Sequence, residues 1–204
     1  IFKADNIPFL ASDFDTAHKL WEASRSHIEK ALKKDGLKLL FAVPWPPQGF
    51  YTKTAINSGA DIKGMKLRAY SPATSRLAVL LGASPTTVQT PEIPQAFSTG
   101  LIDAMVTSPS TGVSSQSWDY VSNYTDTQAW IPKNMVIVNA RAFKRLSKEN
   151  QKAVMDAAAK AESRGWDLAM SETKSKTKML ADKGMNVSKP SAQLKADLQA
   201  VGAT

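Results

Sequence analysis

The longest uninterrupted pattern in the chain is helical and runs from about Ser147 to Lys183. Apolar or small residues recur there at steps of three and four, and Gly184 follows as a stop signal. At 1.5 Å per residue, such a helix would be roughly 50 Å long, which is more than one small domain needs. We therefore expect this helix to run across two lobes.

Between this helix and the first quarter of the chain, strand and helix patterns alternate. Thr90-Pro91-Glu92 is a helix start, in which we expect the hydroxyl of Thr90 to cap the helix and Pro91 to occupy its first position. The resulting order β-β-α-β-α-β predicts an α/β lobe. The expected strands cover 51–55, 66–70, 83–89 and 101–106, and the expected helices cover 72–81 and 91–100.

The flanking segments predict a second group of elements. An amphipathic helix begins near Phe14 and stops at Asp35-Gly36. The apolar run that follows, Leu37 to Val43, indicates a buried strand of the parallel type. Further strands are expected at 120–130, 134–139 and 185–187, with a last amphipathic helix at 191–201.

Arg68 is the main candidate for a binding residue. It lies near the end of the expected strand 66–70, on the same face as Tyr70, and Ser71-Pro72 starts the next helix. Open α/β sheets bind ligands at the carboxyl ends of their strands, and a guanidinium matches a carboxylate with two parallel donors. The alternative is a surface or interdomain salt bridge.

Two loops supply further candidates. Pro44-Trp45-Pro46-Pro47-Gln48-Gly49-Phe50 cannot be a helix or a central strand, and its aromatic side chains either line a pocket or fill the core. Thr107 and Ser108 follow the expected strand 101–106 with small hydroxyl groups that allow a ligand to approach. Trp130 is a possible pocket wall, although burial in the core is the usual role of tryptophan.

Composition and motifs exclude several classes of function. The formal charge of +8 is spread along the expected helices rather than gathered in runs, so we expect no nucleic-acid partner. No run of about 18 apolar residues predicts a membrane span. The chain has no cysteine, and its histidines, His18 and His27, lie on one helix at a spacing that does not suit a metal.

Evidence for enzyme chemistry is weak in the sequence. Nucleotide-binding and nucleophile-elbow motifs are missing, and the carboxylates of Glu92 and Asp103 suit structural roles at a helix start and a turn. We therefore expect no catalytic residues, no cofactor and no metal. A hydrolase or isomerase on a similar α/β frame remains an alternative, as does a sensory ligand-binding domain.

Several motifs in the expected α/β lobe, together with the long helix after them, resemble solute-binding proteins of tripartite ATP-independent periplasmic (TRAP) transporters, of the DctP type. Their spacing is more specific than any single motif, and the resemblance covers nearly the whole chain. The motifs are Gly64-Met65-Lys66-Leu67-Arg68, Leu81-Gly82-Ala83-Ser84-Pro85, Glu92 with Ala96-Phe97, and Gly100-Leu101-Ile102-Asp103-Ala104.

The resemblance implies a periplasmic protein that closes on a small organic acid and delivers it to a membrane permease. Arg68 falls on the arginine that holds the ligand carboxylate in this family. An asparagine usual in the family is replaced near Thr107 and Ser108, and a second arginine is absent near Gln48. These departures favour a less charged or more apolar ligand tail, packed by Trp45, Phe50 or Trp130.

The resemblance also implies a two-lobed periplasmic-binding-protein-like fold in which the N-terminal part of lobe one is missing. Residues 1–45 and 134–173 would then belong to lobe one, and residues 46–133 and 174–204 to lobe two. By the same comparison the chain would be an internal portion of a longer protein, and it would lack half the cleft or borrow it from another chain. The first residue, Ile1, fits either a removed leader or a longer chain.

Overall fold

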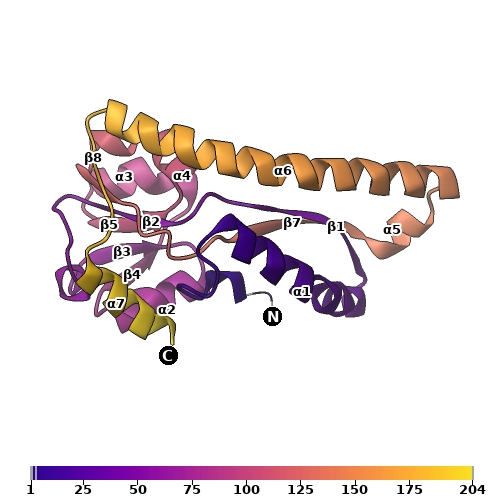
Figure 1. Cartoon of the computed structure of the whole chain (residues 1–204), viewed down its shortest axis with the longest axis horizontal. Helices are drawn as coiled ribbons and strands as arrows, with labels where there is room; N and C mark the ends of the chain where they lie inside the picture. Colours follow the sequence, from indigo (N-terminus) through magenta and orange to yellow (C-terminus); the bar gives the residue numbers. More distant parts are fainter. Residues whose placement is uncertain (1, 3, 204) are drawn as a thin grey trace.

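The computed structural model describes residue 2 and residues 4–203. One helix, α6 (Lys148–Asp182), runs along most of the length of the molecule, above a six-stranded sheet and a separate two-stranded ribbon (Figure 1). Ser147 caps its start by accepting a hydrogen bond from the Asn150 amide, and Gly184 follows its end with a φ of 89°. The predicted long helix is therefore confirmed to within one residue at each end.

The six-stranded sheet has the order β4-β3-β5-β2-β6-β8. β3 is parallel to β4 and β5, whereas β2 is antiparallel to both β5 and β6, and β8 is parallel to β6. The strands are β2 (Gly49–Thr52), β3 (Lys66–Ala69), β4 (Ser84–Thr87), β5 (Ala104–Thr107), β6 (Asn123–Thr125) and β8 (Asn186–Ser188).

Helices cover both faces of this sheet. In Figure 1, α2 and α7 lie below it, and α3, α4 and one end of α6 lie above it. Alternation along β2 sends Phe50 to the lower core with Leu67 and Leu194, and Tyr51 to the upper core with Met105. The helices are α2 (Pro72–Leu80), α3 (Ile93–Ser98), α4 (Pro109–Ser114) and α7 (Ala192–Gly202).

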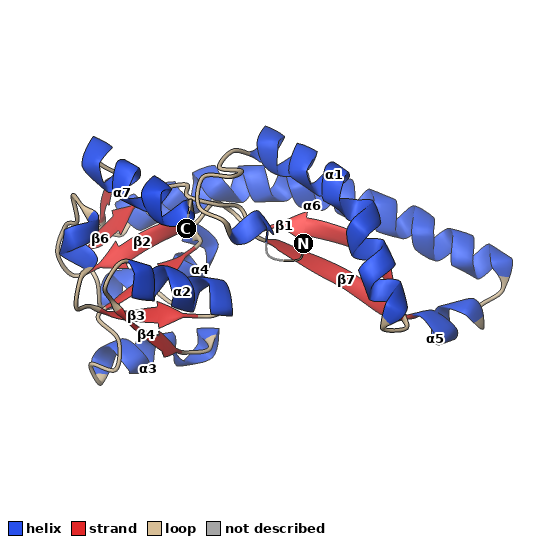
Figure 2. Ribbon diagram, turned by 90° about the horizontal axis from the view of Figure 1, so that it is seen from below, coloured by secondary structure: helices blue, strands red, loops and turns tan. Residues whose placement is uncertain are grey.

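The second body is an antiparallel ribbon of β1 (Leu37–Pro44) and β7 (Lys133–Asn139), which lies beside α1 (Phe14–Lys34) and α6 (Figure 2). The prediction of a parallel-type strand at 37–43 was wrong. Its apolar run reflects packing against two helices, because Leu39 and Ala42 share a core with Trp21 of α1 and Trp166 of α6. A short helix, α5 (Ala140–Lys144), follows β7.

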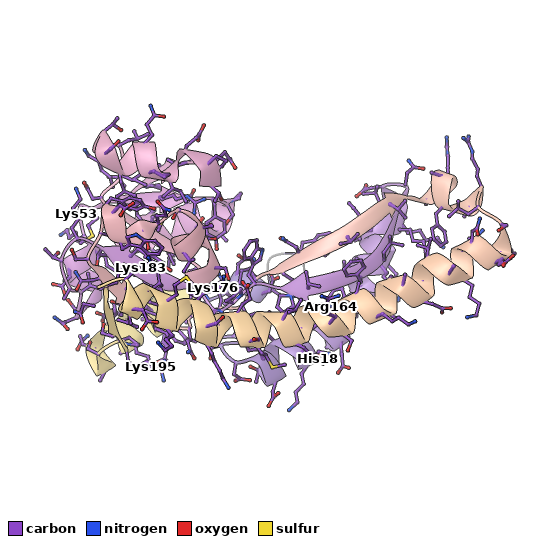
Figure 3. All side chains as sticks on the ribbon, turned by 90° about the horizontal axis from the view of Figure 1, so that it is seen from above. His18, Lys53, Arg164, Lys176, Lys183 and Lys195 are labelled. Atoms are coloured by element: carbon purple, nitrogen blue, oxygen red, sulfur yellow. The ribbon has the colours of Figure 1, made fainter. Side chains whose placement is uncertain are left out.

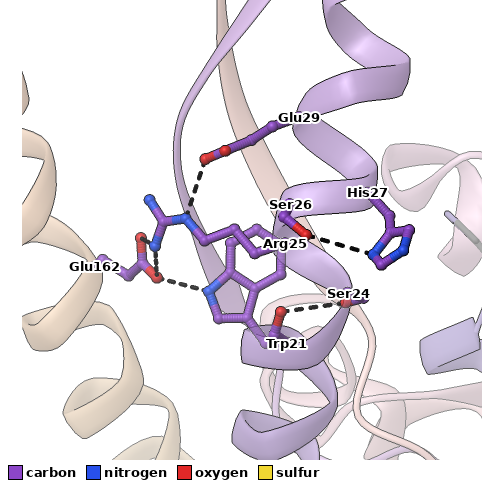
Figure 4. A network of polar contacts seen from close by, with 7 residues as sticks. All are labelled: Trp21, Ser24, Arg25, Ser26, His27, Glu29 and Glu162. Carbon is purple, nitrogen blue, oxygen red and sulfur yellow. Dashed lines mark hydrogen bonds and ion pairs between the residues drawn. The ribbon is translucent and has the colours of Figure 1, made fainter.

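A polar network also ties α1 to α6. Oε1 of Glu162 accepts hydrogen bonds from Nε1 of Trp21 at 2.6 Å and from Nη1 of Arg25 at 3.1 Å (Figure 4). Arg25 also pairs with Glu29 one turn along α1, at 3.3 Å. The network holds the outer half of α6 against the ribbon and lies away from the six-stranded sheet.

Two extended segments connect the bodies beside α6. The Trp45 amide donates to the carbonyl oxygen of Pro132 at 2.8 Å, and the Gln48 amide donates to that of Trp130 at 3.0 Å. These bonds explain why the expected strand at 120–130 shrinks to three residues in β6, since residues beyond Thr125 follow the connection instead of the sheet. The remaining short elements are 3-10 helices at Ala4–Asn6, Gly59–Ile62, Thr90–Glu92 and Ser117–Asp119.

Candidate functional site

One edge of the six-stranded sheet gathers the polar candidates. The carboxyl ends of β3, β4 and β5 meet there because these strands are parallel. β2 runs the opposite way, so its first residue, Gly49, lies beside Thr107 and brings Gln48 to the same edge. The order of the strands thus places Gln48, Arg68 and Thr107 around one point, as expected for a ligand site in an open α/β sheet.

Arg68 is fixed at this edge by hydrogen bonds to the segment that follows β4. Its Nε donates to the carbonyl oxygen of Val88 at 2.9 Å, and its Nη2 donates to Oγ1 of Thr90 at 3.4 Å. Thr90 was expected to cap a helix, but Gln89 occupies the cap position and the Thr90 hydroxyl serves Arg68 instead. The guanidinium also lies over the ring of Tyr70, 5.5 Å from its centroid.

The charge of Arg68 has no acidic partner within the part of the chain that the structure describes. The residue is only 3% exposed. Burial lowers the pKa of its guanidinium from the ordinary value, and the neighbouring phenols of Tyr70 and Tyr120 oppose that change. An arginine nevertheless stays protonated at neutral pH, so an unpaired positive charge faces the site.

Tyr70 and Gln48 form the next part of the wall. The Tyr70 hydroxyl donates to Oε1 of Gln48 at 3.1 Å, while Nε2 of Gln48 donates to the carbonyl oxygen of Pro46 at 3.0 Å. Burial raises the pKa of Tyr70 to about 12, so its phenol is neutral over the physiological range. The chain of bonds fixes the orientation of both side chains.

Thr107 and Ser108 end β5 and begin α4. Ser108 caps α4 by accepting a hydrogen bond from the Thr111 amide at 3.2 Å, and its carbonyl oxygen accepts one from the Tyr51 hydroxyl at 3.1 Å. Gly112 allows this approach, because a Cβ there would lie 2.2 Å from the Tyr51 oxygen. The tight packing places a row of hydroxyl groups on α4 beside Arg68.

These residues line a cavity of about 670 Å³ between the two bodies. Trp45, which is 38% exposed, contributes an aromatic wall, and Lys133 reaches the cavity from the start of β7. Lys133 is paired with Asp5 at 3.0 Å. Six of the eight predicted site residues line the cavity, namely Trp45, Gln48, Arg68, Tyr70, Thr107 and Ser108.

The structure does not place the other two, Phe50 and Trp130, at the cavity. Phe50 is fully buried in the core under α2 and α7, since it lies on the face of β2 opposite to Tyr51. Trp130 is 1% exposed and packs in the same core. Both aromatic side chains therefore pack in the core of this structure, and a contact of either one with a ligand stays a prediction.

Most of the residues that reach the cavity from outside the sheet edge were not predicted from the sequence. Those on α6 carried only an i, i+4 charge pattern, which many surface helices share. Asn134 was read only as the first residue of a strand, and Lys133 lay outside every expected element. The missed lining residues are Asn6, Gln89, Thr90, Ser110, Thr111, Val113, Ser114, Pro132, Lys133, Asn134, Glu172 and Lys176.

The remaining acidic and histidine side chains have structural contacts. Glu92 accepts a hydrogen bond from the Gln89 amide, and Asp103 accepts one from the Lys66 amide. His18 contacts Glu22 and the edge of Trp166, and it does not line the cavity at the sheet edge. Among residues 2 and 4–203, no three histidine or acidic side chains are grouped to hold a metal, and no helix has the length and apolarity to span a membrane.

Two α/β bodies joined by short connections and a shared long helix, with a cavity between them, define a solute-binding protein of the periplasmic type. The chain belongs to the family described as DctP, bacterial extracellular solute-binding protein, family 7, whose model matches residues 1–203. It is thus a relative of the TRAP solute receptors, which are receptors of transporters and not enzymes.

Solved structures of such receptors resemble the chain closely. DctP7 of Bordetella pertussis, an extracytoplasmic solute receptor binding pyroglutamic acid, is 55% identical with a TM-score of 0.97. DctP6 of the same organism, also binding pyroglutamic acid, is 43% identical with a TM-score of 0.97. In both cases the match covers 98% of this chain and 67% of the other.

A third match is a TRAP solute-binding protein from a marine metagenome, specific for pyroglutamate and crystallised with co-purified pyroglutamate. It is 33% identical, with a TM-score of 0.95 over 99% of this chain and 66% of the other. The chain thus spans about two thirds of the length of these receptors.

Proposed function

We propose that this protein captures a small monocarboxylate in the periplasm and delivers it to a TRAP membrane permease. Pyroglutamate, a five-membered lactam with one carboxylate, is the ligand we propose first. The carboxylate would pair with Arg68, and the ring would lie against Trp45. The observation that carries the proposal is the buried, oriented guanidinium of Arg68, which has no acidic partner among the described residues.

Three features support this assignment. An uncompensated buried charge is costly, so a fold that retains one usually gains from a counter-ion supplied by a ligand. Three receptors of at least 33% identity bind pyroglutamate. The small hydroxyl groups of Thr107 and Ser108 leave room for a compact ring and can act as donors or acceptors.

We also propose the lobe assignment expected from the sequence. Residues 1–45 and 134–173 would form the part of lobe one that this chain contains, and residues 46–133 and 174–204 would form lobe two. Closure would then bring Trp45 and Asn134 toward Arg68. Small-angle scattering with and without ligand would test this, because closure should reduce the radius of gyration.

Calorimetric titration of the full-length protein tests the function. Pyroglutamate should bind, and Arg68→Ala should weaken binding by about 2–5 kcal/mol, because a charge-assisted bidentate contact is lost from a buried site. Lys66→Ala is the matched control, since Lys66 lies on the same strand, carries the same charge and does not line the cavity. Undiminished binding by the Arg68 variant would contradict the proposal.

A further inference from the structure

The long helix contributes two charged residues to the cavity, Glu172 and Lys176, which lie one turn apart. Figure 3 labels Lys176 where α6 passes the junction between the two bodies. Glu172 is the only carboxylate among the described residues that line this cavity. The cavity therefore has a positive group on the sheet edge and a negative one on the helix.

The carboxylate of Glu172 is held in place by one hydrogen bond and can still accept others. Its Oε2 accepts a hydrogen bond from Oγ of Ser110 on α4 at 2.6 Å. Its Oε1 lies 3.8 Å from Nζ of Lys176, which is too long for a hydrogen bond. A carboxylate has about four acceptor sites, and this side chain is 43% exposed, so acceptor capacity remains toward the cavity.

A fixed acceptor of this kind selects among carboxylic acids. A ligand whose second polar end is an N–H or O–H group can donate to Glu172, whereas a second carboxylate or an ether oxygen would place lone pairs against its charge. Specificity often depends on such a repulsive element as well as on an attractive one. Arg68 and Glu172 line the same cavity without contacting each other. Together they favour a ligand that has one carboxylate and one hydrogen-bond donor.

We propose that Glu172 is a specificity-determining residue that accepts a hydrogen bond from the donor end of the ligand. For pyroglutamate, that donor is the lactam N–H. The inference rests on the proposed function, because it assumes that the carboxylate binds at Arg68. It adds the substrate class: monocarboxylates with a neutral hydrogen-bond donor, and not dicarboxylates.

The test compares two ligands of nearly identical shape. Pyroglutamate has an N–H in its ring, and the lactone analogue, 5-oxotetrahydrofuran-2-carboxylate, has an oxygen at that position. Calorimetry on the wild-type protein should give at least about tenfold tighter binding of the lactam, because a site built to bind an N–H rejects an analogue that lacks it. Equal affinity for the two ligands would overturn the proposal.

Glu172→Gln should reduce this preference to within about threefold, since an amide can donate to the ring oxygen as well as accept from N–H. The same variant should gain affinity for glutarate, a dicarboxylate, once the repulsion is removed. A preference that stays the same in Glu172→Gln would also overturn the proposal. Glu172→Asp, which keeps the charge but shortens the side chain, provides a second variant should the amide impair folding.

Ser110→Ala separates positioning from direct contact, because it removes the bond that positions Glu172 and leaves the carboxylate in place. It should lower the preference less than Glu172→Gln does, whereas an equal loss in both variants would assign the effect to the packing of α4 on α6 and contradict direct contact. Arg68→Lys separates the two proposals. It should weaken both ligands alike if Arg68 binds the carboxylate, and its failure to do so would refute the proposed function alone.

Discussion

Nε of Arg68 donates a hydrogen bond to the carbonyl oxygen of Val88, 2.9 Å away on the neighbouring strand connection. This bond uses the inner edge of the guanidinium and leaves Nη1 outside the hydrogen bonds of the described residues. The orientation of the guanidinium is therefore set by the backbone carbonyl of Val88, just after β4, before any ligand binds. Preorganisation of this kind lowers the entropic cost of binding.

Arg68→Lys should weaken carboxylate binding at least tenfold, or by about 1.4 kcal/mol. A lysine keeps the charge but cannot both donate to Val88 and present two parallel donors. Titration calorimetry would measure the loss, and thermal unfolding without ligand would show whether the fold is retained. Binding equal to that of the wild type would show that charge alone matters here.

Trp45→Ala should mainly weaken ligand binding, whereas Phe50→Ala should mainly lower the stability of the fold. Trp45 is partly exposed at the cavity, so its removal should weaken binding roughly tenfold with little effect on unfolding. Phe50 is fully buried away from the cavity, so its removal should lower the free energy of unfolding by about 3–5 kcal/mol. Urea denaturation and calorimetry on both variants would decide. A normal stability for Phe50→Ala would contradict its assignment to the core.

Tyr70→Phe should change the response of stability to alkaline pH. The pKa of Tyr70 is raised to about 12 in the folded protein, chiefly by burial. Between the ordinary tyrosine value of about 10 and this value, the unfolded state loses a proton that the folded state keeps. The contribution to stability is therefore complete below about pH 10 and is lost as the pH rises through the folded pKa.

Burial also raises the pKa values of Tyr51 and Tyr124, so alkaline destabilisation should persist in Tyr70→Phe with a smaller slope. Urea denaturation at several alkaline pH values would measure the two slopes. At neutral pH the variant loses the bond to Gln48, which should cost about 0.5–1.5 kcal/mol. A slope identical to that of the wild type would show that Tyr70 titrates at its ordinary value.

Glu162→Ala should destabilise the ribbon body without affecting the cavity. Its loss would leave Nε1 of Trp21 without the acceptor shown in Figure 4, which should cost about 1–3 kcal/mol. Glu29→Ala is the control, because Glu29 contacts Arg25 only as an exposed pair worth about 0–1 kcal/mol. Similar losses in the two variants, measured by chemical denaturation, would contradict a special role for the bond between Trp21 and Glu162.

Gly112→Ala should strain the packing of α4 against Tyr51 of β2. The added Cβ would lie 2.2 Å from the Tyr51 hydroxyl, and overpacking of this kind costs about 1–3 kcal/mol. Because Tyr51 also donates to the carbonyl oxygen of Ser108, the shift should disturb the cavity wall and weaken binding. Ser114→Ala, on the same helix, is the control for stability. Unchanged stability in Gly112→Ala would show that Tyr51 can move freely.

Local sequence signals were sufficient wherever one element decides the outcome. The apolar period and stop glycine defined α6, and the change from apolar alternation to Ser71-Pro72 placed Arg68 at a strand end. These signals are short-range, because helix caps, turns and side-chain alternation depend on a few adjacent residues. The family resemblance followed from the same ordered motifs and agrees with the match over residues 1–203.

Only the tertiary structure decided which strands pair and which residues line the cavity. The apolar run at 37–43 indicated burial but not whether strands or helices provide it, and two helices do. Phe50 and Tyr51 are adjacent aromatics that alternation sends to opposite faces of the sheet, and only the packing of the sheet decides which core each one enters. Glu172 reaches the same cavity as Arg68 from a helix about a hundred positions later, a proximity that no local pattern can encode.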